Sequence, residues 1–201
     1  APKAYLLADG STVYAPRASN DRLLLGLKGS LNEYELDLLR QRSLEARRAK
    51  AKRGELIIIA PVGFRKTDDQ RLAKDPDRRV QAAIRLVFDQ FERIGSVRQT
   101  LLWFHEHDLQ LPAATPRGEI CWKRPRYGSV YQMLTNPVYG GAYAYGKTER
   151  GTRYEAGQAR QRDRRKPREQ WLALIPRAHE GYVDWERFER IQHAIRANLH
   201  V

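Results

Sequence analysis

Cations, aromatic rings and hydrogen-bonding side chains follow one another over residues 123–132, which read Lys-Arg-Pro-Arg-Tyr-Gly-Ser-Val-Tyr-Gln. Helices that read nucleic acids often present such groups in their first turns, where side chains touch base edges and cations touch phosphates. On a helix here, Arg126, Ser129 and Gln132 would face outwards, and Arg124 would lie just ahead of it. The pattern predicts a nucleic-acid-reading helix; a purely structural helix after a basic loop is the alternative.

Other chemistry is poorly supported by residue type and spacing. His105 and His107 flank a glutamate, but side chains two residues apart on a helix point about 200° apart and cannot share one metal ion. The acidic pairs suit turns and helix caps. No serine has a neighbouring histidine, and the single cysteine, Cys121, has no paired base nearby. The sequence therefore predicts no metal site, no cofactor and no complete active site.

The composition restricts the class of protein. The chain has 201 residues, a net charge of +13, 41% hydrophobic and 30% charged residues, which argues against a disordered chain and against a membrane protein. A single cysteine excludes a disulfide framework within the chain and indicates a reducing, cytoplasmic compartment. A strongly basic chain predicts a polyanionic partner, with nucleic acid first and an anionic membrane surface second.

The positive charge is concentrated in one segment. Residues 137–168 contain nine basic and three acidic side chains, so they carry +6 of the net +13. The last 33 residues carry five acidic and four basic side chains. Charge that served only solubility would be dispersed, so this clustering favours a basic surface that faces a ligand and a neutral end that packs.

A long helix is predicted over Ser30–Arg53. Ser30 and Glu33 form a capping box, no glycine or proline interrupts the segment, and Gly54 provides a stop. Its leucines lie in the first two-thirds, and its last seven residues contain five cations, Arg48, Lys52 and Arg53 among them. We expect the apolar end to contact a partner and the basic end to approach phosphates.

Shorter elements are predicted before and after this helix in the sequence. Two strands, Ala4–Leu7 and Thr12–Tyr14, precede it. The long helix is followed by a strand or extended linker (Leu56–Ala60), a turn, a helix that starts at Asp75-Pro76 and a second helix capped by Ser96. Next come a loop (Leu111–Arg124), a helix (Arg126–Thr135) and a strand (Val138–Gly146). The chain continues with a basic hairpin tip (Lys147–Arg168), a strand (Trp171–Ile175) and a helix capped by Asp184. The predicted fold class is α+β: a mostly helical domain with a small β-sheet, preceded by a long α-helix.

The order of several motifs resembles one family. The segment 20–33 resembles the end of the catalytic domain of serine recombinases of the resolvase/invertase superfamily, and residues 50–56 with 61–64 resemble the exit from their long helix. The segment Val130–Gly141 resembles the most recognisable motif of the recombinase domain of large serine recombinases. His179-Glu180, Val183-Asp184 and Phe188 resemble its closing helix.

The resemblance implies a domain division and a chemistry. Residues 1–29 would be the remnant of a catalytic domain, 30–53 the linking helix, and 54–201 the recombinase DNA-binding domain. Large serine recombinases cut DNA through a serine that becomes linked to a 5′ phosphate, and that serine would precede this chain. Ser19 is interpreted as a loop residue, and Leu36 stands where small resolvases carry an arginine. The cysteine-bearing zinc ribbon that usually follows is missing, so the fragment is expected to be non-catalytic and its full-length parent a site-specific recombinase.

The resemblance also implies contacts and partners. Arg53, Arg65 and Lys66, with Arg48 and Lys52, are the expected phosphate or minor-groove residues, and the linker 54–66 would lie against the minor groove. Arg124, Arg126, Ser129 and Gln132 are the expected major-groove residues. Lys147, Arg150, Arg153 and the cluster Arg160–Arg168 would supply non-specific attraction. The expected partners are double-stranded DNA and, through the long helix of the full-length protein, further copies of it (a dimer, and a tetramer at synapsis), for DNA integration, excision or inversion.

Two other functions remain open at this point. A basic RNA-binding or ribosome-associated module would use tyrosines such as Tyr143 and Tyr145 as stacking platforms. A metal-dependent nuclease would use His105 and His107, although their spacing argues against it. Competition between duplex DNA and structured RNA would separate the first alternative from DNA binding.

Overall fold

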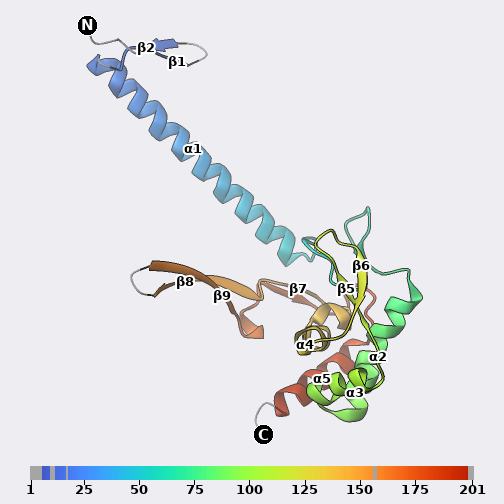
Figure 1. Ribbon diagram of the computed structural model, residues 1–201. Coiled ribbons are helices and arrows are strands. Elements are labelled where there is room, and N and C mark those ends of the chain that lie inside the picture. The colour runs from blue at the N-terminus through green and yellow to red at the C-terminus, as the bar shows by residue number, and fades with distance from the viewer. Residues whose placement is uncertain (1–5, 10–11, 17, 156–157, 199–201) are drawn as a thin grey trace. The chain divides into compact units, whose positions relative to one another are not determined.

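The computed structural model describes residues 6–9, 12–16, 18–155 and 158–198 (Figure 1). Contacts within the chain divide it into two units, Ala1–Ala49 and Lys50–Val201. Each unit is described by itself.

The first unit contains a small hairpin and most of a long helix. Strand β1 (Leu7–Asp9) pairs antiparallel with β2 (Thr12–Tyr14), with Leu7 opposite Tyr14. The predicted strand Thr12–Tyr14 is confirmed. The strand predicted at Ala4–Leu7 lies further along the chain, at Leu7–Asp9 (β1). Ala4 and Tyr5 lie outside the described residues.

The long helix begins earlier than predicted. α1 spans Ser19–Lys52, so Ser30 lies inside it and is not its cap. Asp21 lies in the first turn and accepts a hydrogen bond from the backbone N–H of Ala15 at 2.7 Å. A single helical glycine costs only about 1 kcal/mol, so glycines near residue 30 do not stop a leucine-rich helix. The predicted end is confirmed, because Gly54 follows with φ 79° and its N–H bonds the carbonyl of Ala51.

Four helices build the core of the second unit: α2 (Arg78–Ile94), α3 (Val97–Glu106), α4 (Tyr127–Thr135) and α5 (Trp185–Ala197). An apolar stripe on α2 (Val80, Ile84, Val87, Phe88 and Phe91) is buried throughout. It packs with side chains of the other three helices in one cluster, in which Ile84, Phe104, Leu134 and Phe188 are at most 1% exposed. This core fixes α4 and α5 next to each other.

The helix boundaries follow local capping chemistry. The predicted start of α2 at Asp75 is wrong: Asp77 is its N-cap, because the Asp75 carboxylate accepts from the N–H of Asp77 at 2.9 Å and holds Pro76 in the preceding turn. Ser96 caps α3 and Asp184 caps α5, as predicted. The Asp184 carboxylate accepts from the N–H of Arg187 at 2.6 Å.

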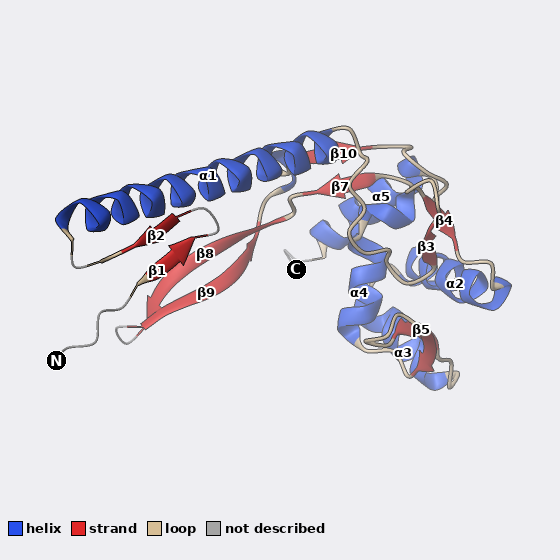
Figure 2. Cartoon of the chain, turned by 90° about the horizontal axis from the view of Figure 1, so that it is seen from above, coloured by secondary structure: helices blue, strands red, loops and turns tan. Residues whose placement is uncertain are grey.

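The strands of the second unit form four antiparallel pairs (Figure 2). They are β3 (Phe64–Lys66) with β4 (Leu72–Lys74), β5 (Leu111–Ala114) with β6 (Ile120–Lys123), β7 (Tyr143–Tyr145) with β10 (Ala173–Ile175), and β8 (Thr148–Glu155) with β9 (Gln158–Arg165). The α+β fold class is confirmed, although the strands form separate pairs rather than one sheet.

Two of the sequence predictions fail at these strands, and of the two alternatives for Leu56–Ala60, a strand or an extended linker, the linker is confirmed. The predicted loop Leu111–Arg124 is a hairpin, closed by a turn in which Gly118 has φ 83°. The predicted strand Val138–Gly146 begins as a 3-10 helix, η1 (Pro137–Gly140), because Asn136 caps it and proline fits its first position. Leu56–Ala60 pairs with no strand.

The extended linker after α1 is held by side chains instead of by a strand. The hydroxyl of Tyr143 donates to the carbonyl of Leu56 at 3.0 Å, and that of Tyr139 donates to Val62 at 2.8 Å. The hydroxyl of Tyr182 donates to Gly63 at 2.5 Å. These bonds fix the path of the linker beside η1. None of the helices in the described ranges combines the length and the apolar character that crossing a membrane requires.

Candidate nucleic-acid interface

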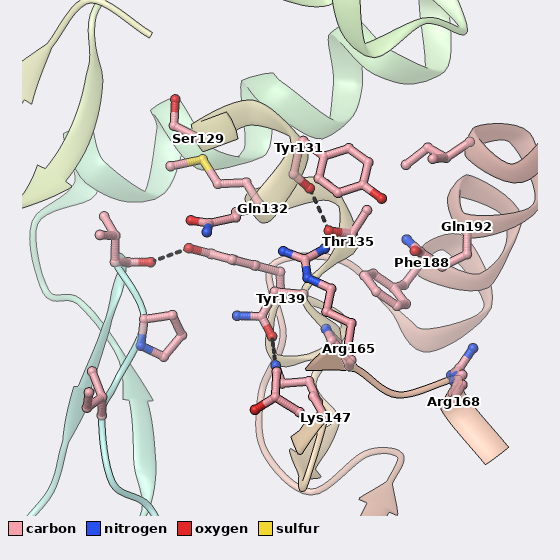
Figure 3. A pocket seen from close by; sticks show the side chains of 18 of the residues that line it. Ser129, Tyr131, Gln132, Thr135, Tyr139, Lys147, Arg165, Arg168, Phe188 and Gln192 are labelled. Carbon is pink, nitrogen blue, oxygen red and sulfur yellow. Dashed lines mark hydrogen bonds between the residues drawn. The ribbon is translucent and has the colours of Figure 1, made fainter. Parts of the chain in front are cut away.

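A groove of about 790 Å³ lies between α4, the linker, strand β5, the base of the β8–β9 hairpin and α5 (Figure 3). It brings together three predicted contact residues, Ser129, Gln132 and Lys147. Its other polar lining includes Asn136, Thr148, Arg165, Lys166, Arg168, Gln192 and Arg196. Residues far apart in the sequence thus meet at one basic surface, which we call the α4 groove.

Lys147 is half-buried at the hairpin side of this groove. Its ammonium group donates to the side-chain oxygen of Asn136 at 3.0 Å. Burial lowers the pKa of Lys147, and the positive charge of Arg165 lowers that pKa further. Within the described ranges, neither Lys147 nor Arg165 forms an ion pair with a carboxylate. The closeness of these two positive side chains makes this part of the groove a favourable place for an anion.

Other cations at the hairpin base already have acidic partners. Arg168 makes two hydrogen bonds to the carboxylate of Glu189, at 2.9 and 2.5 Å, and lies over the ring of Trp185. Lys166 pairs with Glu149 at 3.3 Å. The contact of Arg168 positions the hairpin base against α5, and among the described cations of the base that line the groove, Lys147 and Arg165 have no carboxylate partner.

The first turn of α4 uses one predicted contact group for its own structure. The Ser129 hydroxyl accepts from the N–H of Arg126 at 3.0 Å and donates to the carbonyl of Arg126 at 2.7 Å. Since its proton is already used, this hydroxyl can only accept one further hydrogen bond. The Gln132 side chain is exposed and makes no hydrogen bond within the described part of the chain, so all its donors and acceptors are available.

The remaining residues predicted for the major groove lie outside the lining of the α4 groove. Arg124 and Arg126 are exposed, just before α4, and their guanidinium groups form no ion pair with a described residue. They flank the groove at the start of the helix and are free to meet an anion.

A second groove, of about 810 Å³, lies around the linker and includes Arg53 and Lys66 from the predicted phosphate contacts. Arg53 forms two 2.8 Å hydrogen bonds to Glu55, which raise the pKa of Arg53 and lower the pKa of Glu55. The Lys66 ammonium lies 3.4 Å from the carbonyl of Ile57. Arg65 is exposed outside this groove. The charge of Arg53 is therefore partly balanced before any ligand arrives.

The other predicted cations are dispersed. Arg48 and Lys52 are exposed on α1. Arg150 lies 3.7 Å from Asp163 across the hairpin. The side chain of Arg153 lies outside the described residues. The structure thus brings five of the twelve individually predicted residues into two grooves, together with Arg165, Lys166 and Arg168 of the predicted cluster Arg160–Arg168.

The structure argues against two alternative sites, a tyrosine stacking platform and a histidine metal site. Tyr143 is buried and its hydroxyl bonds the linker, so its prediction as a stacking platform is wrong; Tyr145 is half-buried in β7. His105 bonds the carbonyl of Pro125, and His107 bonds that of Trp103. Among the described residues, no group of histidine, cysteine, aspartate or glutamate side chains has the arrangement of a metal site.

Sequence reasoning missed part of the α4 groove. Asn136 carries no binding signal in the sequence, yet its side-chain oxygen accepts from Lys147 and orients it. Arg196 lines the groove from the neutral C-terminal segment, where charge counting gave no signal. Proximity across the fold, rather than local pattern, selects these residues.

Comparisons with known proteins agree with the resemblance. The model of the family described as Recombinase matches residues 78–198. The chain is 39% identical over 197 residues to the "Uncharacterized protein y4bA/y4pH" of Sinorhizobium fredii (strain NBRC 101917 / NGR234); this covers 96% of the chain and 28% of the relative. The chain therefore spans little more than a quarter of that protein.

A solved structure shares the fold. A chain of the "Crystal Structure of a LSR-DNA Complex" matches with a TM-score of 0.50 at 17% identity, and the match covers 76% of this chain and 38% of that one. The region that the family model matches contains the four core helices of the second unit and all of the α4 groove lining except the linker residues 59–62. The chain belongs to the Recombinase family of serine recombinases.

Proposed function

We propose that the chain binds duplex DNA as the DNA-binding part of a site-specific serine recombinase. The observation that carries the proposal is the α4 groove, which Lys147, Arg165 and the exposed amide of Gln132 line together; the described part of the chain offers neither cation a carboxylate partner. Cations of this kind suit phosphates, and an exposed amide on a short helix suits base edges.

In this proposal α4 enters the major groove, which is about 12 Å wide and admits a helix. Gln132 can form a bidentate pair with adenine, whereas Ser129 can only accept, for example from the amino group of cytosine. Arg124 and Arg126 lie at the entry of the helix and contact phosphates or base edges. Lys147 and Arg165 neutralise a backbone phosphate, which positions the protein without reading sequence.

Family membership supports a wider proposal for the parent protein. Residues 1–29 would close a catalytic domain, 30–53 would form the linking helix, and 54–201 the DNA-binding domain. The parent would exchange DNA strands through a serine outside this chain, and the chain alone would be non-catalytic. The apolar end of α1 would mediate self-association of the parent.

The test is selection of bound sequences from a random duplex pool by the 201-residue chain, followed by binding of the selected duplex measured by fluorescence anisotropy. We expect an enriched motif and preference for duplex DNA over structured RNA. Retention without enrichment, or stronger binding to RNA, would contradict the proposal.

Three variants assign the roles. Gln132→Ala should relax preference at one base pair and cost about 1–3 kcal/mol on the selected site. Lys147→Gln should weaken all sequences alike. Arg93→Gln, which removes an exposed positive charge from the last turn of α2, is the charge-matched control. If Lys147→Gln and the control weaken binding equally, the α4 groove is not the phosphate site.

A further inference from the structure

Gly128 is the second residue of α4, on the side of the helix away from the core. Val130, Met133 and Leu134 are buried on the inner side, whereas Gly128 and Gln132, four residues apart, share the outer side. The backbone of the helix is therefore most accessible next to the proposed base-reading amide.

Nothing inside the protein requires a glycine at this position. A Cβ atom added to Gly128 would meet no atom within 4 Å, and its φ is not in the left-handed region. The other described glycines of the second unit, apart from Gly151 in the hairpin, have either a positive φ or an atom less than 3 Å from an added Cβ. Neither the backbone conformation nor the packing of the described residues therefore requires a glycine at position 128.

Glycine is a poor helix former, and alanine here would stabilise the helix. An exposed helical glycine without an internal role is typical of a site where another molecule approaches the backbone closely. An aromatic wall borders the position: Tyr127, which is 50% exposed, stacks on Tyr131 with ring centroids 6.0 Å apart and an interplanar angle of 16°. Such stacking holds the Tyr127 ring in place before any ligand binds.

We propose that duplex DNA comes into van der Waals contact with the backbone of α4 at Gly128, and that Tyr127 forms the side of this contact. The inference rests on the proposed function, since the exposed amide of Gln132 and the groove cations Lys147 and Arg165, which have no carboxylate partner among the described residues, select DNA as the occupant. A side chain at position 128 would hold the helix away from the base edges and weaken the bond that Gln132 makes.

This role has a signature that a structural role lacks: stability and binding change in opposite directions. Gly128→Ala should raise the melting temperature by about 1–3 °C, because alanine favours the helix. The same change should raise the Kd for the selected duplex by about tenfold, because the new methyl group occupies the contact. Gly128→Leu should weaken binding further. A glycine needed for folding would instead lower the melting temperature when it is replaced.

The experiment measures melting temperature and anisotropy Kd for the wild-type chain, Gly128→Ala and Gly128→Leu. Ala82→Leu, at an exposed position of α2, is the control for added bulk and should bind like the wild type. Tyr127→Phe should retain affinity and Tyr127→Ala should lose it. If the wild type binds the duplex and both Gly128 variants bind equally well, the inference is wrong while the proposed function stands. If the wild type itself does not bind duplex DNA, the proposed function fails.

Discussion

At the scale of single residues, His179 ties stability to pH. Its Nε2 lies 2.9 Å from the carbonyl of Val138, and the edge of its ring meets Phe64. Burial lowers the pKa of His179, and the bond to Val138 offsets this in part. As the pH falls below about 6.5, the unfolded chain binds the proton that the folded chain resists. The stability contribution is present above that pH and is lost as the pH falls.

The measurement is the free energy of unfolding in urea at pH 7.5 and at pH 5.5. We expect the wild type to lose more stability over this interval than His179→Gln, whose amide can still donate to Val138. His193→Gln, at an exposed position on α5, should behave like the wild type. Equal losses in the wild type and in His179→Gln would show that another group controls this pH range.

The sequence pattern predicted which side chains of α4 face outwards, but it did not predict which groups those side chains contact. The run of residues 123–132 identified Gln132 and Ser129, because helical spacing alone decides which side chains face outwards. The pattern could not show that the Ser129 proton is used by Arg126, nor that Lys147 and Arg165 lie together. Hydrogen-bond partners and cation pairs depend on the packed structure, so the sequence leaves them undetermined.

At the scale of elements, the cap of α5 is a local device with a measurable contribution. The Asp184 carboxylate accepts from the N–H of Arg187 at 2.6 Å. Loss of such a cap typically costs about 1 kcal/mol, so Asp184→Ala should destabilise the chain by this amount. Asp184→Asn should retain most of the stability, since asparagine also caps helices well. Denaturation in urea measures both, and equal losses would assign the effect to charge rather than to capping.

The apolar residues of α1 lead to a second prediction at this scale. Leu24, Leu27, Leu31 and Tyr34 recur at spacings of three and four, and each is between 49% and 66% exposed. This is the spacing of a coiled-coil seam. Leu31→Asp should therefore reduce concentration-dependent self-association in sedimentation experiments, while Glu35→Ala on the same helix should not. If the chain is monomeric at all accessible concentrations, the prediction fails for this chain, and self-association through α1 could occur only in the parent protein.

The helices and several strands could be predicted from the sequence, whereas the pairs β3–β4 and β5–β6 could not. The stop at Gly54 and the caps Ser96 and Asp184 depend on local rules, and the structure confirms them. The start of α1 was misplaced because glycine costs too little to stop a leucine-rich helix. The hairpin β5–β6 was missed because its strands, four residues each, show no alternation. Short strand pairs depend on partners, which a linear pattern does not reveal.

At the scale of the whole molecule, the net charge of +13 should appear as a steep salt dependence of binding. If the chain neutralises about six phosphates, the slope of log K against log salt is near −5. The β8–β9 hairpin, residues 148–165, carries six basic and three acidic side chains, and the register places Arg162 and Arg164 on one face of β9. Arg162→Gln with Arg164→Gln should reduce the slope by about 1–2 if both touch phosphates, whereas Arg93→Gln should leave it unchanged. An unchanged slope in the double variant would remove the hairpin from the DNA contact and assign the salt dependence to the α4 groove and the linker.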